Sequence, residues 1–309
     1  MIYAPLILLA VVICLALIPR FVESQRVKTS VAERQGAAGQ FAQLSQGITH
    51  YAWHGPARGK VIVAVHGLTT PQVVWESMLP GLVAMGYRVL TYDLYGRGLS
   101  DAPSGPQDAH FFVRQLNDLL EHEGVSEEIT YLGYSMGGAI VAEAASGTPH
   151  QAAQVLLVAP SGFKTIESAF SRFCRRVPLI GDWVHSVFAP LRMRASVEKN
   201  PSSEHVAYVE REQVSQLHKQ GYLRAVLSSR RGLLDQSTEV AHRFLADQGI
   251  PVAAVWAGQD SVIPVVALAD LAVWNRDALQ DVIDDADHRM PYTHGPEVTA
   301  RLRALIKEA

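Results

Sequence analysis

Residues 133–138 read Gly-Tyr-Ser-Met-Gly-Gly, which matches the pattern G-x-S-x-G with Ser135 at its centre. A short β-branched and aromatic run, 129–132, precedes this motif, and a small-residue stretch with helical character follows it. A strand, a sharp turn and a helix in this order would expose the serine hydroxyl and direct free backbone N–H groups toward it. Chance matches to the pattern are common, but this context favours a nucleophile over a plain glycine-rich turn.

A serine hydroxyl is a weak nucleophile at neutral pH and needs an adjacent base. His288 is the candidate base because it follows the last expected strand, 279–283, and precedes the last expected helix. A surface loop histidine is the plainer interpretation. The alternative bases are His66, His185, His205, His218 and His294.

Asp260 follows the apolar run 252–256 and precedes a helix that can hold Pro264 in its first turn. A carboxylate buried against His288 would fix the tautomer of the imidazole and stabilise its protonated form. The alternative is that Asp260 only caps the helix. The three residues follow one another in the chain in the order Ser135, Asp260, His288.

Backbone N–H groups near the serine would have to bind the negative charge that develops on a carbonyl oxygen. Residues 66–70 read His-Gly-Leu-Thr-Thr and end another expected strand, so we expect the N–H groups of Leu68 and Met136 to form this oxyanion hole. Residues 93–101 contain two glycines two positions apart. No helix opens there, so a structural turn is favoured over a phosphate-binding loop.

The elements that position these residues alternate along the chain. Short apolar runs between helical segments predict an α/β fold, a mostly parallel central sheet with helices on both faces. Reactive groups gather at the carboxyl ends of such strands. The expected strands are 61–65, 88–92, 129–132, 155–158, 252–256 and 279–283, the last at an edge. The expected helices are 74–85, 108–123, 136–146, 265–274 and 296–307.

Residues 162–248 interrupt this alternation because they read as helices without strands. We expect a helical cap over the active end of the sheet. Its apolar residues include Phe170, Phe173, Trp183 and Phe188, which would either form a site for acyl chains or pack onto the sheet.

The joint set of motifs resembles the α/β-hydrolase superfamily, in particular its esterase and monoacylglycerol-lipase-like members, both membrane-anchored and soluble. The resemblance covers residues 50–309 and is carried by His66-Gly67, Asp93-x-x-Gly96-x-Gly98-x-Ser100, Gly133-x-Ser135-x-Gly137-Gly138, Gly258-x-Asp260-x-x-x-Pro264 and Asp287-His288. It implies a serine hydrolase that cleaves carboxylic esters, with Ser135, His288 and Asp260 as its triad. The nucleophile is not an aspartate, which separates the chain from dehalogenase-like and epoxide-hydrolase-like branches, and the loop after Gly67 lacks the further glycines of the proline-iminopeptidase pattern.

The same triad would serve a carbon–carbon bond hydrolase, an amidase or a thioesterase. A non-catalytic binding protein of the same fold is the competing class.

We expect no metal and no organic cofactor, because no metal-binding motif is visible. We expect a small-molecule ester as the partner, of lipophilic character. The net charge of −3, without a long basic run, gives no indication of nucleic-acid binding. The oligomeric state is left open.

The first residues differ in kind from the rest. Ile2 to Ile18 carries no charge and, as a helix, would be about 25 Å long, just enough to span a bilayer core. We expect a membrane anchor over 1–19, a linker over 20–40 and the hydrolase domain over 41–309. Only the start methionine precedes the run, so the basic region of an ordinary cleaved signal is missing; an uncleaved or atypical signal peptide is the alternative. Lys and Arg after this helix favour a cytoplasmic catalytic domain. Cys14 and Cys174 are not expected to pair, because Cys14 lies inside the apolar segment.

Overall fold

The computed structural model describes residues 3–197 and 203–308. The strands are β1 (Gln40–Leu44), β2 (Gly47–His54), β3 (Lys60–Val65), β4 (Tyr87–Tyr92), β5 (Ile129–Tyr134), β6 (Ala152–Val158), β7 (Val252–Ala257) and β8 (Leu279–Ile283). The helices are α1 (Tyr3–Ser24), α2 (Val31–Gln35), α3 (Leu79–Ala84), α4 (Ala109–His122), α5 (Met136–Gly147), α6 (Ala169–Arg176), α7 (Ile180–Val197), α8 (Glu204–Ser215), α9 (Tyr222–Arg231), α10 (Glu239–Asp247), α11 (Leu268–Trp274), α12 (Met290–Thr293) and α13 (Gly295–Glu308).

The eight strands form one sheet in the order β1-β2-β4-β3-β5-β6-β7-β8. Strands β3 to β8 pair in parallel, whereas β1 and β2 form an antiparallel hairpin that joins the sheet at β4. The predicted mostly parallel sheet is confirmed, and β8 lies at an edge as expected. The hairpin was not predicted.

Helices cover both faces of the sheet because successive side chains of each strand point to opposite faces. In β3, for example, Val63 and Val65 pack with α4, α5, α10 and α11, whereas Ile62 and Ala64 pack with α3 and α13. Both sets are fully buried. The two apolar clusters make the sheet rigid, and this rigid sheet carries the loops at its carboxyl end.

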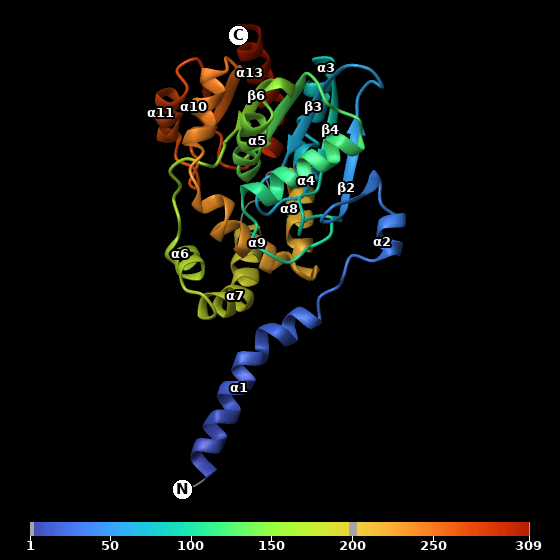
Figure 1. Cartoon of the computed structure of the whole chain (residues 1–309). Coiled ribbons are helices and arrows are strands. Elements are labelled where there is room, and N and C mark those ends of the chain that lie inside the picture. The colour runs from blue at the N-terminus through green and yellow to red at the C-terminus, as the bar shows by residue number, and fades with distance from the viewer. Residues whose placement is uncertain (1–2, 198–202, 309) are drawn as a thin grey trace.

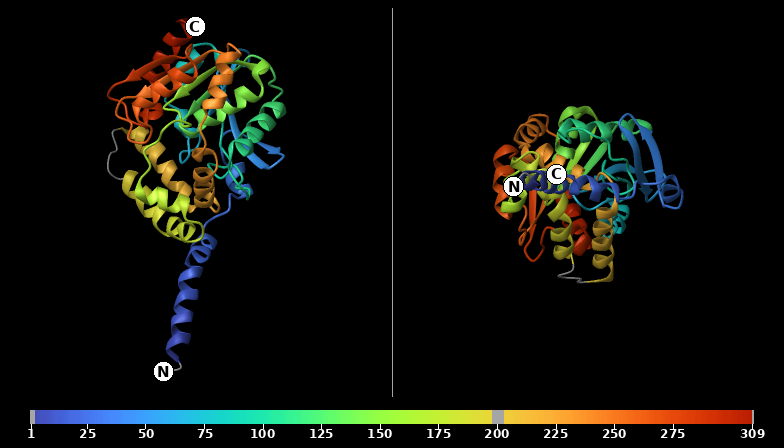
Figure 2. Two further views of the ribbon diagram at one scale, coloured as in Figure 1. Left: turned by 60° about the vertical axis from the view of Figure 1, so that its left-hand side comes forward. Right: turned by 90° about the horizontal axis from the view of Figure 1, so that it is seen from below.

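A group of helices stands over the carboxyl end of the sheet, between the sheet and α1 (Figures 1 and 2). We call α6, α7, α8 and α9 the cap helices. The fifth helix of the interval expected to form the cap, α10, packs instead against α5 and α11 on the sheet. The described residues of 162–248 contain no strand, as predicted.

Helix α1 projects from the cap end of the molecule, opposite the C-terminus (Figure 1). Its segment Pro5–Ser24 has a mean hydropathy of 2.6 and is exposed, so it is long and apolar enough to cross a membrane by length and composition. A signal sequence passes the same test. The end of α1 and the segment after it are fixed to the connection between α8 and α9. The Glu23 carboxylate accepts from the N–H of Gly221, and Val27 forms a parallel bridge with Lys219.

Candidate active site

Ser135 occupies the sharp turn between β5 and α5, with φ 52° and ψ −119°. A residue other than glycine rarely adopts positive φ, so neighbouring contacts must hold this conformation. The N–H of Ser135 donates to the carbonyl of Val158, and Ser161 Oγ donates to the carbonyl of Ser135. The turn also needs glycine beside it, because a Cβ on Gly137 would overlap the carbonyl oxygen of Val65.

The structure brings Ser135, His288 and Asp260 together from the ends of three strands. His288 Nε2 lies 2.9 Å from Ser135 Oγ, and His288 Nδ1 lies 2.7 Å from Asp260 Oδ2. These residues are far apart in the chain but follow β5, β8 and β7, whose carboxyl ends meet at one edge of the sheet. His294, an alternative base, instead contacts the hydroxyl of Thr293 through its Nδ1.

Asp260 uses both carboxylate oxygens. Its Oδ1 accepts from the N–H groups of Val262 and Ile263, at 2.7 and 2.8 Å, while Oδ2 faces His288. The side chain is 1% exposed. Asp260 therefore fixes the turn 260–263 and contacts the imidazole, but it does not cap α11, whose N-cap is Ala267, so the helix-cap interpretation was wrong.

The loop after β3 brings Leu68 beside Ser135. Gly67 packs closely against Ser135, because a Cβ added to Gly67 would lie only 3.2 Å from the Cβ of Ser135. Within the described residues, neither the N–H of Leu68 nor that of Met136 donates a hydrogen bond. Both N–H groups therefore have no acceptor in the described part of the chain, and their role as an oxyanion hole stays a prediction.

Two buried side chains hold this loop. His66 Nε2 accepts from the N–H of Leu94, so its Nδ1 carries the proton and donates to the carbonyl of Gly67. Burial lowers the pKa of His66 to about 4, which keeps it neutral. Arg97 donates from Nε to the carbonyl of Leu68 and from Nη2 to Ser229 of the cap. His66 thus has a positioning role and is not beside Ser135 as a base.

A cavity of about 910 Å³ opens at Ser135 and His288. Its apolar lining includes Phe163 and Trp274, whose rings stack at 4.8 Å. Its charged lining includes Glu167, Arg175 and Arg230. The cavity is large enough for a small ester and has both an apolar and a polar wall.

The aromatic residues expected to form an acyl site, Phe170, Phe173, Trp183 and Phe188, do not line this cavity. Phe170 packs within the cap, Phe173 and Phe188 are exposed, and Trp183 Nε1 donates to the carbonyl of Leu15 in α1. Both sequence-based interpretations of these four residues were therefore wrong. Helical spacing identifies an apolar face but not the element that the face meets, which here includes α1.

Three further residues fix the His288 loop and were not found from the sequence. Tyr134 donates from its hydroxyl to the carbonyl of His288 at 2.9 Å. Arg289 forms ion pairs with Asp287, at 2.8 Å, and with the buried Glu210 of α8, at 3.0 Å. The position of Tyr134 inside the serine motif was a usable signal. Glu210 lies 79 residues from Arg289, so no sequence spacing could have indicated that pair.

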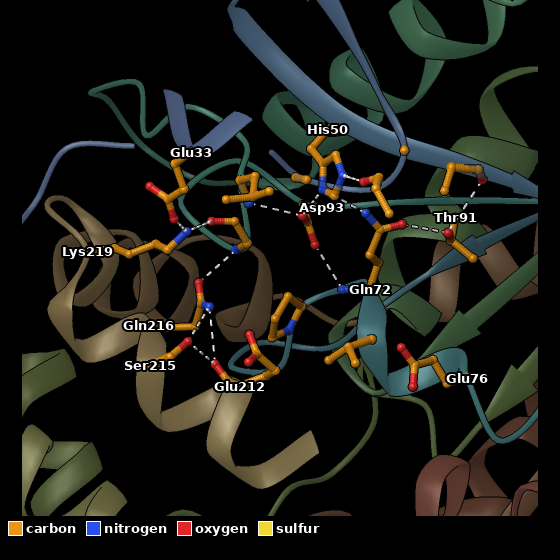
Figure 3. Close-up of a pocket in the computed structure, with 18 of the residues that line it drawn as sticks. Glu33, His50, Gln72, Glu76, Thr91, Asp93, Glu212, Ser215, Gln216 and Lys219 are labelled. Atoms are coloured by element: carbon orange, nitrogen blue, oxygen red, sulfur yellow. Dashed lines mark hydrogen bonds and ion pairs between the residues drawn. The ribbon is translucent and has the colours of Figure 1, made fainter. Parts of the chain in front are cut away.

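A second cavity, of about 730 Å³, lies between β2, β4, α8 and the segment before β1, and it contains none of the predicted site residues (Figure 3). On its wall His50 places Nδ1 2.6 Å from Asp93 Oδ2 and Nε2 2.8 Å from the carbonyl of Ala38. His50 Nδ1 also lies 2.8 Å from the amide nitrogen of Gln72. Burial lowers the pKa of His50, but its hydrogen bond and ion pair with Asp93 raise it overall. Asp93 also accepts from the N–H groups of Gln72 and Leu99. The glycine-containing turn 93–101 is thus organised around Asp93, as the structural interpretation predicted.

The comparisons with known proteins agree with this architecture. Residues 60–294 match the family model described as the alpha/beta hydrolase fold. A pimeloyl-[acyl-carrier protein] methyl ester esterase of Aliivibrio salmonicida is 25% identical over 267 residues, which are 84% of this chain and 97% of the relative.

Two solved structures are similar in fold. An esterase from Exiguobacterium antarcticum has a TM-score of 0.70 at 17% identity and covers 87% of this chain and 99% of its own. A membrane phospholipase A, described as a bacterial virulence factor, has a TM-score of 0.70 at 17% identity and covers 99% of this chain and 97% of its own. With the family model matched over most of its length, the chain belongs to the alpha/beta hydrolase family.

Proposed function

We propose that this protein is a serine hydrolase that cleaves carboxylic esters with a lipophilic acyl group. Ser135 Oγ attacks the ester carbonyl while His288 Nε2 takes its proton, and the N–H groups of Leu68 and Met136 bind the oxyanion. His288 then protonates the leaving alcohol, which departs and leaves an acyl-enzyme. Water then attacks the acyl-enzyme while His288 takes its proton, and His288 returns this proton to Ser135 Oγ as the acid is released. Asp260 orients the imidazole and stabilises its cation.

The observation that carries this proposal is the continuous series of short contacts from Ser135 through His288 to Asp260, at 2.9 and 2.7 Å. The strained backbone of Ser135 and the two unused N–H groups beside it support the same chemistry. The methyl ester esterase that covers most of the chain supports ester hydrolysis over amide, thioester or carbon–carbon bond cleavage.

A fluorophosphonate probe tests catalysis directly, because only an activated serine reacts with it. The full chain should be labelled at Ser135, and the variant Ser135→Ala should not be labelled. Parallel assays with an ester, an amide and a thioester of the same acyl group then identify the type of bond that the protein cleaves. Absence of labelling would favour the non-catalytic class, and faster thioester than ester turnover would correct the reaction.

Because one wall of the cavity is apolar, we expect a higher kcat/KM for medium-chain esters than for acetate esters. Leu234→Trp should narrow the cavity and lower kcat/KM for an octanoate ester about 10-fold more than for an acetate ester. Val240→Trp, at an exposed position of α10, is the matched control. A wild-type preference for short or charged acyl groups would contradict the lipophilic substrate.

We further propose the division into a membrane anchor over 1–19, a connecting segment over 20–40 and a hydrolase domain over 41–309 with its cap inside 162–248. The exposed apolar helix α1 supports the anchor. The similarity to the membrane phospholipase, which extends over 99% of the chain, also supports it, whereas the esterase covers 87%. Flotation of the full chain with liposomes tests this attachment.

A further inference from the structure

A third cavity lies where α1 meets the cap. Its volume is about 770 Å³, and its walls come from the C-terminal end of α1, from α7 and from α9. Three contacts hold these walls together: Trp183 Nε1 donates to the carbonyl of Leu15, the Glu23 carboxylate accepts from the N–H of Gly221, and Val27 pairs with Lys219. The cavity is therefore built by the folded chain and is not a gap beside a loose helix.

The charges of this cavity leave an excess of guanidinium groups. Five charged side chains line it. The Asp182 carboxylate pairs with Arg231 at 2.6 Å, and Arg231 also donates to the carbonyls of Cys174 and Arg175. The Glu23 carboxylate pairs with Arg26, which lies outside the lining. Both carboxylates of the cavity are thus neutralised by partners.

Arg20 and Arg224 remain. In the described part of the chain Arg20 makes no hydrogen bond or ion pair, and Arg224 donates only to the carbonyl of Ala102, at 3.1 Å. Burial lowers the pKa of His185 in the same wall to about 4, and its Nε2 has no hydrogen-bond partner among the described residues although the residue is 5% exposed. Two guanidinium groups without a carboxylate partner among the described residues, together with an unpartnered buried polar atom, point to an anionic ligand with additional polar groups.

The position of the cavity identifies the source of that anion. The uncharged part of α1 ends at Ile18 and is about 25 Å long as a helix, just enough to span a bilayer core. Pro19 and Arg20 follow it directly and would lie at headgroup depth, and Leu223 and Leu227 give the cavity an apolar side. Phosphates pair well with arginine forks, and basic pockets beside membrane helices bind anionic headgroups.

We propose that this cavity binds the phosphodiester headgroup of an anionic phospholipid from the surrounding membrane, with Arg20 and Arg224 as its ligands. The proposal rests on the membrane attachment proposed above and is independent of the catalytic assignment. A bound lipid would join α1 to the cap and fix the orientation of the catalytic domain over the bilayer.

The test uses the full chain in nanodiscs of phosphatidylglycerol and phosphatidylcholine, followed by native mass spectrometry to count retained lipids. Wild-type protein should retain one phosphatidylglycerol in preference to phosphatidylcholine. Arg20→Gln combined with Arg224→Gln should weaken this preference about 10-fold. Arg276→Gln combined with Arg303→Gln, at exposed positions on the sheet domain, should leave it unchanged.

Equal retention of the two lipids by wild-type protein, or equal loss in both double variants, would overturn the site. Displacement of the lipid by millimolar inorganic phosphate would show that the cavity binds a soluble anion and would overturn the assignment of its ligand as a phospholipid. Flotation with liposomes separates the two proposals. A chain that floats without retaining phosphatidylglycerol overturns only this site, whereas a chain that does not float overturns the membrane attachment as well.

Discussion

The conformation of Ser135 shows how single residues set up the site. A positive φ at a serine costs about 1–3 kcal/mol, and such strain persists only where surrounding contacts over-determine it. Here the hydrogen bonds to Val158 and Ser161 fix the turn, and the absence of a side chain at Gly137 lets α5 approach β3. The serine hydroxyl is thereby presented to His288 without any movement of the backbone.

The three central residues should act as a unit. Ser135→Ala and His288→Ala should each lower ester turnover by about 10⁴–10⁶, and Asp260→Asn somewhat less, because the remaining members cannot transfer the proton alone. Single-turnover assays with a chromogenic ester, together with circular dichroism to verify folding, measure this. His294→Ala is the control and should retain activity. Loss of activity in His294→Ala with retention in His288→Ala would identify a different base.

A second residue-scale expectation concerns His50. Burial alone lowers the pKa of His50, but its hydrogen bond and ion pair with Asp93 raise it above the ordinary value. The pKa of Asp93 is lowered, because its bonds to His50 outweigh the opposing effect of burial. A raised histidine pKa gives stability that is complete below about pH 6.5 and is lost as pH rises through the folded value.

The melting temperature of the detergent-solubilised chain should therefore fall as pH rises above about 6.5. His50→Gln should lower it at pH 6 by an amount equivalent to about 2–3 kcal/mol and flatten this dependence, because a charge-assisted hydrogen bond is lost. His110→Gln, an exposed position on α4, is the matched control. An unchanged pH slope in His50→Gln would show that another group titrates.

At the scale of elements, helix α8 connects the cap to the loop of His288, the proposed base. Glu210 of α8 is buried and pairs with Arg289, the residue that follows His288. Glu210 is 5% exposed and Arg289 is 31% exposed, and their ion pair links α8 to the loop that carries the imidazole. Arg97 makes a corresponding connection between Ser229 of α9 and the Leu68 loop.

Glu210→Gln should consequently lower kcat about 10-fold with little change in KM, since small displacements of a catalytic group reduce the rate steeply. The rate of fluorophosphonate labelling should fall by the same factor, which a purely structural defect away from the site would not produce. Arg301→Gln removes two surface ion pairs, with Asp281 and Glu297, and is the control. Wild-type labelling rates in a folded Glu210→Gln would rule out this positioning role.

The elements that could be predicted from the sequence are those whose buried side chains are apolar. The six parallel strands have continuous or alternating apolar runs, and motif residues at their ends predicted where Ser135, Asp260 and His288 would meet. Strand β2 was missed because its buried residues include Thr49 and His50, whose polar groups are satisfied by Gln115 and Asp93. A polar side chain can be buried when a residue far away in the sequence satisfies its hydrogen bonds, and such a strand then shows no hydrophobic periodicity in the sequence.

At the scale of the whole molecule, the position of α1 decides how the enzyme meets its substrate. The helix leaves from the cap end, so the cap and the carboxyl end of the sheet lie on the membrane side of the domain if α1 is inserted (Figure 2). The contacts of Glu23 and Val27 with the cap restrict rotation of the domain about the helix. A lipophilic ester in the bilayer would then have a short path to the cavity at Ser135.

The last expectation is the side of the membrane on which the domain lies. A membrane helix orients with its more basic flank in the cytoplasm, and only the C-terminal flank of α1 carries Lys or Arg: Arg20, Arg26, Lys28 and Arg34. We therefore expect a cytoplasmic catalytic domain with the N-terminus outside.

In bacterial cells that express the full chain, protease added to intact spheroplasts should leave the domain uncut, and lysis should expose it. Introducing two lysines after Met1 while replacing Arg20 and Arg26 by Gln should shift the domain toward the outside. Digestion of the wild-type domain in intact spheroplasts, or recovery of a soluble protein without residues 1–20, would instead identify the helix as an export signal.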